Sequence, residues 1–189
     1  MTAVLSVGSN MGDRLAHLQG AVDGLGPAVR AVSPVYQTAP WGGVEQDDFL
    51  NAIILVDAAG GAPREWLARA RALEAAAGRV RGVRWGPRTL DVDIVAIDGA
   101  RSADPEITLP HPRAHERGFV LLPWLDVQPD AVLPAHGPVR DLVERLPAAE
   151  RAGVHRTDLT LRVQAAATEP AAAGPAAGGG AVTGDAGPA

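Results

Sequence analysis

The sequence contains no cysteine, which excludes a disulfide framework, a thiolate metal site and thiol chemistry. It also contains no lysine, because all 17 basic residues are arginine. A P-loop lysine, the active-site lysine of a protein kinase and a Schiff-base lysine are therefore excluded as well. A strong GC bias of the genome would account for the missing lysine and for the abundance of alanine, glycine and proline.

Long apolar runs are also missing. The sequence has no stretch of about 18 consecutive apolar residues, and it does not open with a basic segment followed by an apolar one. We therefore expect a cytoplasmic protein without a membrane partner. The net charge of −5 argues against a nucleic-acid partner, and we expect a monomer that acts on small molecules.

The composition divides the chain into one domain and a tail. Residues 165–189 consist mainly of alanine, glycine and proline and contain no aromatic residue. Such a segment cannot bury enough apolar surface to offset the conformational entropy lost on folding. We therefore expect a folded domain over residues 1–164 and a disordered tail over residues 165–189.

The predicted elements follow the order strand, helix, strand, strand, helix, strand. This is the split βαβ, ferredoxin-like order, an α+β fold with a mostly antiparallel sheet and two helices on one face. Two later helices, at 113–127 (bent at Pro123) and 139–146, would cover the other face, and Asp98-Gly99 predicts a hairpin. The strands are expected at 3–8, 29–38, 49–57 and 90–97, and the first two helices at 13–25 and 63–77.

The last of these strands carries two aspartates. Asp91 and Asp93 are two residues apart, so their carboxylates project from the same face of the strand. Two like charges in a half-buried sheet destabilise it unless a positive group meets them, so removing either one should relieve strain in an empty site. Leu90, Val92, Ile94 and Ala96 make the other face apolar, and Val95 and Ile97 continue the aspartate face, which predicts a strand covered on both sides.

Arginines gather immediately before the two aspartates, at positions 79, 81, 84 and 88. Guanidinium groups bind phosphate oxygens in a bidentate way, and paired carboxylates hold Mg²⁺. A polyphosphate with two magnesium ions would satisfy both sets of side chains. The alternative is that Asp91 and Asp93 form plain salt bridges with Arg84 and Arg88, although buried ion pairs add little net stability.

Two further segments carry candidate ligand contacts. His111, Arg113, His115 and Arg117 lie within seven residues and suggest additional anion contacts. Trp41 and Trp85 each lie beside glycine in a predicted loop, where they could close over a flat ligand or simply pack against the loop. The loops at 39–48 and 79–87 are candidate lids that would exclude water from a reaction.

Several motifs together resemble the 6-hydroxymethyl-7,8-dihydropterin pyrophosphokinase family over residues 3 to 147. They are VGSNMGDR at 7–14, Tyr36 with Thr38-x-Pro40, Phe49-Leu50-Asn51, Glu74 with Gly78-Arg79-x-Arg81, RWGPRTLDVDI at 84–94 and LPHPRAHERGFVL at 109–121. The resemblance implies an enzyme that moves pyrophosphate from ATP to the hydroxymethyl group of a reduced pterin during folate synthesis.

The resemblance also implies roles for individual residues. Asp91 and Asp93 would bind two magnesium ions, and Arg79, Arg88 and Arg117 would hold the triphosphate and steady the transferred group. Phosphoryl-type transfer needs positioning and charge neutralisation rather than a covalent nucleophile, so the missing cysteine and lysine are no handicap. The nucleotide side would further include Glu74, Arg81, Trp85, Ile94 and His111, and the pterin side Thr38, Trp41, Phe49, Asn51 and Phe119.

The sequence departs from some relatives in having Phe49 where others have tyrosine, Ala39 where some have proline, and one residue fewer between Arg81 and Trp85. Stacking needs no hydroxyl group, so the first departure matters little. Two other functions stay open: a different Mg²⁺-nucleotide transferase, in which the predicted pterin residues would lie far from the metal site, and a catalytically silent ligand-binding domain. No general base is evident; Asp93 or water could accept the proton.

Overall fold

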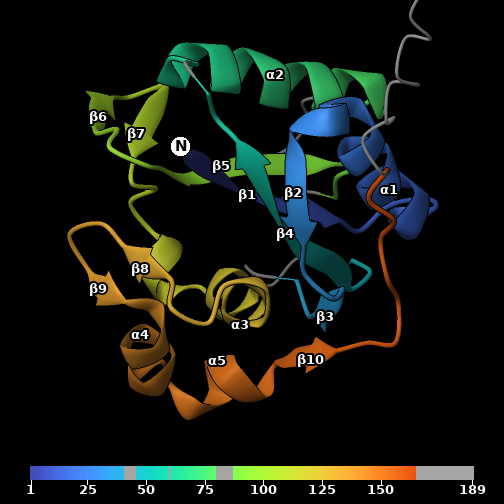
Figure 1. Ribbon diagram of the computed structural model, residues 1–189. Helices are drawn as coiled ribbons and strands as arrows, with labels where there is room; N and C mark the ends of the chain where they lie inside the picture. Colours follow the sequence, from blue (N-terminus) through green and yellow to red (C-terminus); the bar gives the residue numbers. More distant parts are fainter. Residues whose placement is uncertain (41–45, 60, 80–86, 165–189) are drawn as a thin grey trace, which may run out of the picture.

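A computed structural model describes residues 1–40, 46–59, 61–79 and 87–164 (Figure 1). Its main sheet has the strand order β10-β3-β4-β1-β5, with β2 also paired to β4, and all of its pairings are antiparallel. This order confirms the predicted ferredoxin-like α+β fold. The strands are β1 (Thr2–Ser9), β2 (Val29–Val32), β3 (Tyr36–Thr38), β4 (Phe49–Asp57), β5 (Asp91–Ile97) and β10 (Val154–Arg156).

Helices α1 (Arg14–Leu25) and α2 (Pro63–Ala76) pack on one face of the sheet, close to their predicted bounds. Asp13 caps α1, since its Oδ1 accepts a hydrogen bond of 3.0 Å from the Ala16 N–H. Gly26 ends this helix at a positive φ of 56° that favours glycine. The two helices and the central strands enclose a core that includes Leu5, Leu18, Ile54, Trp66 and Leu90.

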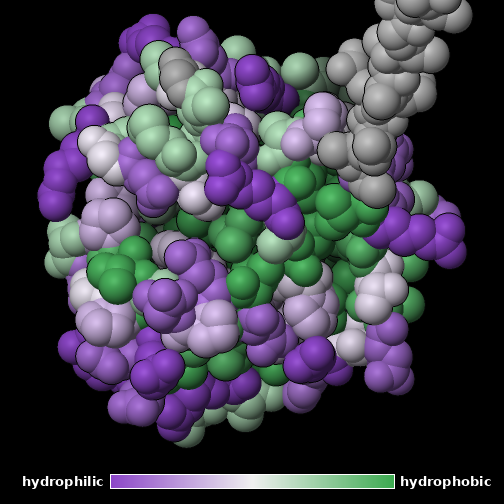
Figure 2. All heavy atoms as spheres, in the orientation of Figure 1, coloured by the Kyte–Doolittle hydropathy of each residue, from purple (hydrophilic) through white to green (hydrophobic). Residues whose placement is uncertain are grey.

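Helices α3 (Gly118–Val127), α4 (Val139–Arg145) and α5 (Ala148–Ala152) lie on the opposite side of the sheet from α1 and α2 (Figure 1). Val120, Leu121 and Trp124 of α3 pack on Ile53 of the sheet. The expectation that later helices cover the second face is therefore confirmed. In the same view, apolar residues show across the middle of the molecule, and hydrophilic residues dominate its outline (Figure 2).

The strand predicted at 29–38 is divided, because Ser33, Pro34 and Val35 separate β2 from β3. Proline has no N–H to donate and interrupts the ladder. Ser33 keeps the junction attached to β4: its N–H donates to the Ile53 carbonyl at 2.9 Å, and its Oγ accepts from the Ile53 N–H at 2.9 Å. The two short strands thus run beside β4 as one interrupted strand, and β10 pairs with β3 on its outer side.

Strand β5 contains an irregularity that the alternating pattern did not predict. Leu5 pairs with Ile94 but its neighbour Val4 pairs with Ala96, so Val95 is an extra residue in β5. Val95 and Ala96 both face the α3 side, and Ile97 faces the α1 side. The predicted faces of Ala96 and Ile97 are therefore wrong, whereas the assignment of residues 90–94 holds.

The helix predicted at 113–127 is also divided. A short 3₁₀ turn, η2 (Ala114–Glu116), precedes α3, and Arg117 between them has an extended backbone with φ −105° and ψ 108°. Pro123 lies within α3. The break leaves Arg117 outside both helical segments.

The remaining strands form small hairpins that the sequence did not predict. The chain turns at Asp98-Gly99, but β6 (Ser102–Asp104) pairs with β7 (Ile107–Leu109) rather than with β5, so the predicted hairpin is wrong. A second hairpin joins β8 (Val132–Leu133) and β9 (Gly137–Pro138), and a 3₁₀ turn, η1 (Gly26–Ala28), follows α1. No helix within the described ranges is long and apolar enough to cross a bilayer. The predicted tail at 165–189 lies outside those ranges and remains a prediction.

A buried tyrosine connects α3 to strand β3 of the sheet. Tyr36 of β3 donates a hydrogen bond of 2.9 Å to Asp126 Oδ2 of α3, and Arg156 Nη1 of β10 lies 3.2 Å from the same oxygen. Burial, followed by the hydrogen bond to Asp126, raises the pKa of Tyr36 to about 12. The neutral phenol is thus stabilised by the fold.

This contact predicts a pH-dependent loss of stability. An unfolded tyrosine ionises near pH 10, whereas the folded one ionises near 12, so stability should fall as the pH rises from about 10 to 12. Without cysteine or lysine, the single tyrosine is the side chain that titrates in this range. Melting temperatures from pH 9 to 11.5 should therefore fall more steeply in the wild type than in Tyr36→Phe, and identical slopes would contradict the proposed contact.

Candidate active site

The site begins where one face of the sheet changes from apolar to polar. Gly8 of β1 pairs with Asn51 of β4 on one side and with Asp91 of β5 on the other, so these three positions share a face. One step along, Ser6 pairs with Asp93. The same face is apolar farther along each strand, where Val4, Ile53 and Val95 pack under the α3 layer.

These residues form the floor of a cavity of about 360 Å³. Ten of the predicted site residues line it, and they come from parts of the sequence that are far apart. Ser6, Gly8, Ala39, Gln46 and Arg113 complete the lining. Trp41, Arg81 and Trp85 lie outside the described residues. The predicted residues in the wall are Thr38, Phe49, Asn51, Arg79, Arg88, Asp91, Asp93, His111, Arg117 and Phe119.

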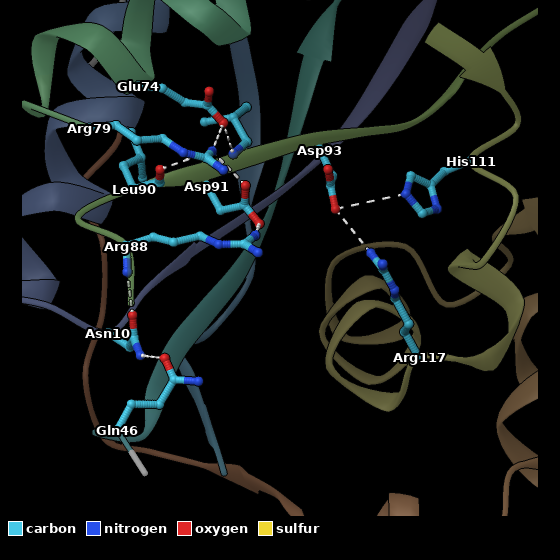
Figure 3. Close-up of polar contacts among 11 residues, drawn as sticks. Asn10, Gln46, Glu74, Arg79, Arg88, Leu90, Asp91, Asp93, His111 and Arg117 are labelled. Atoms are coloured by element: carbon cyan, nitrogen blue, oxygen red, sulfur yellow. Dashed lines mark hydrogen bonds and ion pairs between the residues drawn. The ribbon is translucent and has the colours of Figure 1, made fainter. Parts of the chain in front are cut away.

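Asp91 pairs with two arginines from one side of the cavity (Figure 3). Arg79 Nη1 lies 2.6 Å from Oδ1, and Arg88 Nη1 contacts Oδ2. Arg79 also donates to Glu74 and, at 3.3 Å, to the Leu90 carbonyl. The Asp91 carboxylate is therefore compensated by two guanidinium groups.

Asp93 is compensated from the other side, by residues before α3 (Figure 3). Arg117 Nη1 donates to Asp93 Oδ2 at 2.9 Å, and His111 Nε2 lies 3.8 Å from the same oxygen. Burial, the largest cause, lowers the pKa of His111, so its ring is neutral at neutral pH. Its Nδ1 accepts a hydrogen bond of 3.1 Å from the Arg113 N–H, which assigns the ring proton to Nε2, facing Asp93.

The arrangement corrects one expectation from the sequence. Asp91 and Asp93 do not face one another as uncompensated charges, because each has at least one arginine partner. The salt-bridge alternative is right for Arg88 with Asp91, and Arg84 lies outside the described residues. Removing one carboxylate would therefore take a charged partner from at least one arginine rather than relieve repulsion.

The opposite end of the cavity has amide, hydroxyl and aromatic groups. Asn51 Nδ2 donates to Thr38 Oγ1 at 2.9 Å, and both residues are buried. Phe49 and Phe119 line the cavity, and the Arg117 guanidinium carbon lies 5.6 Å from the centre of the Phe119 ring. A Cβ on Gly8 would come within 3.0 Å of Asn51 Oδ1, so glycine keeps this end of the floor open.

Two predicted residues lie outside the cavity wall. Ile94 belongs to the core between the sheet and α1 and α2, because it is on the face of β5 opposite to Asp93. Its side chain therefore cannot contact a ligand in this cavity. Glu74 of α2 accepts a 3.0 Å hydrogen bond from the Val92 N–H and pairs with Arg79, so it orients that arginine. Burial raises the pKa of Glu74.

The structure also brings together residues to which the sequence assigned no role. Asn10, within the VGSNMGDR motif, is 1% exposed and hydrogen bonds to both Arg88 and Gln46. Ser6 and Gln46 line the cavity. For Asn10, the sequence offered one signal, namely a polar residue directly after a buried strand. Its hydrogen-bond partners Gln46 and Arg88 lie 36 and 78 positions away, so no local pattern in the sequence could identify them.

The two aspartates fit a magnesium site that is completed by a ligand. No group of three or more potential metal-binding side chains occurs among the residues that the structure describes. Mg²⁺ commonly takes one or two protein carboxylates and completes its shell with water and substrate phosphates. Asp91 and Asp93, both partly exposed in the cavity wall, supply that pair of oxygen donors beside arginine side chains.

Comparison with known proteins assigns the chain to a family. Residues 4–129 match the family model 7,8-dihydro-6-hydroxymethylpterin-pyrophosphokinase (HPPK). The chain belongs to the HPPK family. It is 52% identical to the 2-amino-4-hydroxy-6-hydroxymethyldihydropteridine pyrophosphokinase of Mycobacterium tuberculosis. The 163 aligned residues cover 80% of this chain and 87% of the relative. The resemblance noted from the motifs is thereby confirmed.

A second relative agrees with the HPPK assignment, and a solved structure agrees with the fold. The enzyme of the same name from Methylorubrum extorquens is 41% identical over 160 residues, which cover 82% of this chain and 98% of the relative. A crystal structure of Plasmodium falciparum HPPK-DHPS matches with a TM-score of 0.59 and 14% identity, over 82% of this chain. The chain spans less than half, 46%, of that longer protein, and at this identity the match supports the fold alone.

The ion pairs predict that Asp91→Asn destabilises the ligand-free protein, because Arg88 and Arg79 lose a charged partner in a partly buried site. We expect a loss of roughly 1–2 kcal/mol, which corresponds to a melting temperature lower by about 3–6 °C. The matched control is Asp57→Asn, which breaks an exposed pair with Arg30 and should leave the melting temperature essentially unchanged. A higher melting temperature for Asp91→Asn would support carboxylate repulsion instead.

Proposed function

We propose that this protein transfers pyrophosphate from ATP to the hydroxymethyl group of 6-hydroxymethyl-7,8-dihydropterin, giving AMP and the pterin diphosphate in folate biosynthesis. Membership of the HPPK family supports the reaction. The observation that carries the proposal is that one cavity joins a carboxylate–arginine end to an amide–aromatic end. The first end suits a metal-bound triphosphate, and the second suits a flat, hydrogen-bonding ring.

At the nucleotide end, three guanidinium groups in the cavity wall would bind the phosphate oxygens, namely those of Arg79, Arg88 and Arg117. Asp91 and Asp93 would hold two magnesium ions, which supply charge neutralisation for the triphosphate. The arginines that neutralise the carboxylates in the ligand-free site then become available to the phosphates. His111 adds a neutral N–H donor beside Asp93.

At the pterin end, Phe49 and Phe119 line the cavity and can stack on a ring. Asn51 and Thr38 are buried and offer donors and acceptors to the ring edge, which suits the amide-like edge of a pterin. Asp93 and Phe119 line the same cavity as Asn51, which supports the approach of a hydroxymethyl group to the phosphate end. A nucleotide transferase with a distant second substrate is less well supported, since these residues share one cavity.

The chemistry requires an oxygen–phosphorus bond to form and another to break. The hydroxymethyl oxygen attacks the β-phosphorus. The bond between the β-phosphorus and the α–β bridging oxygen breaks, and AMP leaves with that oxygen and its negative charge. Arg88 and Arg117, on opposite sides of the cavity, can stabilise the transferred group and the leaving phosphate. The proton of the hydroxymethyl group passes to Asp93 or to water.

Phosphorus NMR of a reaction with ATP, Mg²⁺ and the reduced pterin tests the proposal. AMP should appear together with a pterin diphosphate, because the bond that breaks lies between the α- and β-phosphates. Appearance of ADP with a pterin monophosphate would indicate an ordinary kinase. Pyrophosphate with unmodified pterin would indicate hydrolysis, and either result would refute the assignment.

The same assay tests the proposed metal-binding role of Asp91 and Asp93. Asp91→Ala and Asp93→Ala should each lower turnover by about two orders of magnitude or more, since each removes a proposed metal ligand. Asp57→Ala, on the exposed end of β4, is the control and should retain wild-type turnover. Turnover close to that of the wild type in Asp91→Ala or Asp93→Ala would refute the metal assignment.

A further inference from the structure

Asn10, at the end of β1, uses its side chain to connect two segments that border the cavity (Figure 3). Its Oδ1 accepts a hydrogen bond of 2.7 Å from the Arg88 N–H. Its Nδ2 donates to Gln46 Oε1 at 2.9 Å and to the Asp47 carbonyl at 3.2 Å. The backbone N–H of Asn10 also donates to the Arg88 carbonyl, at 3.1 Å.

The two connected segments belong to different ends of the cavity. Arg88 pairs with Asp91 and lies at the carboxylate–arginine end. Gln46 lines the cavity and precedes Phe49, which belongs to the aromatic end. Asn10 itself does not line the cavity and is 1% exposed, so it cannot act as a ligand contact there.

We propose that Asn10 is a positioning residue that fixes Arg88 relative to residues 46–49, so that the two substrates meet in reactive geometry. The inference rests on the proposed function and assigns a role to a residue that does not touch the substrates. The carboxamide suits this role because it has both an acceptor and two donors, and the structure uses all of them. Leucine has a similar shape but provides none of these contacts.

The kinetic consequence is a loss of turnover with little change in KM. Misplacement of a catalytic group by about 1 Å can lower the rate about 100-fold, so we expect Asn10→Leu to lower kcat by about 10- to 100-fold. KM for either substrate should change by no more than about threefold, since the groups that bind each substrate remain. Ser33→Ala is the matched control, because it removes another buried side-chain contact to a backbone N–H, outside the cavity, and should retain wild-type kcat.

A double-mutant cycle tests whether Asn10 acts through Arg88. In the Arg88→Ala background, Asn10→Leu should cause little further loss of kcat in single-turnover assays, because the side chain that it positions is already absent. An equal loss in both backgrounds would overturn the proposal. It would also be overturned if Asn10→Leu lowered kcat no more than Ser33→Ala does.

A second measurement does not depend on the reaction. In NMR spectra of the protein without substrates, Gln46→Leu should shift the backbone amide resonance of Arg88 when it is introduced into the wild type. It should cause no such shift when it is introduced into Asn10→Leu, because the connection between the two segments passes through the Asn10 side chain. A shift of equal size in both backgrounds, or none in either, would overturn the connection. If the wild type showed no pyrophosphate transfer while this pattern held, the proposed function would fail and the positioning contact would stand.

Discussion

The negative charge of Asp91 and Asp93 has to be compensated in every state of the site. In the structure, arginines from three places provide the compensation: Arg79 after α2, Arg88 before β5 and Arg117 between η2 and α3. Each arginine is held by further contacts of its own backbone or side chain, such as the Glu74 carboxylate for Arg79. Segments that are distant in the sequence therefore meet at the start of one strand.

The sheet makes this arrangement possible because one half of its α3-facing side carries apolar side chains and the other half carries polar or small ones. Under α3, the central strands present apolar side chains, and this half provides the hydrophobic stabilisation of the second layer. Beyond α3, the same strands present Asn51, Ser6, Gly8 and the aspartates, and small side chains on β1 leave room for the cavity. A rigid sheet thus holds the groups at both ends of the cavity in fixed register, which suits a reaction between two bound substrates.

Local patterns in the sequence were enough to predict much of this. The alternation at residues 90–94 placed both aspartates on one face, and the element order predicted the sheet topology. The extra residue at Val95 and the break at Arg117 depend on how β5 pairs with β1 and how α3 packs, so alternation alone could not reveal them. The pairing of Arg88 with Asp91 was among the alternatives that the sequence raised, whereas Arg79 and Arg117 reach the aspartates through tertiary structure that no local pattern predicts.

We propose that the arginines pair with Asp91 and Asp93 until a metal-bound triphosphate binds in the cavity. A direct test is to measure Mn²⁺ binding to the protein without substrates, with electron paramagnetic resonance as the readout. Replacing Arg117 by glutamine removes the charged arginine partner of Asp93, so Arg117→Gln should bind Mn²⁺ more tightly than the wild type, by about tenfold or more. Equal or weaker Mn²⁺ binding by Arg117→Gln would contradict the claim.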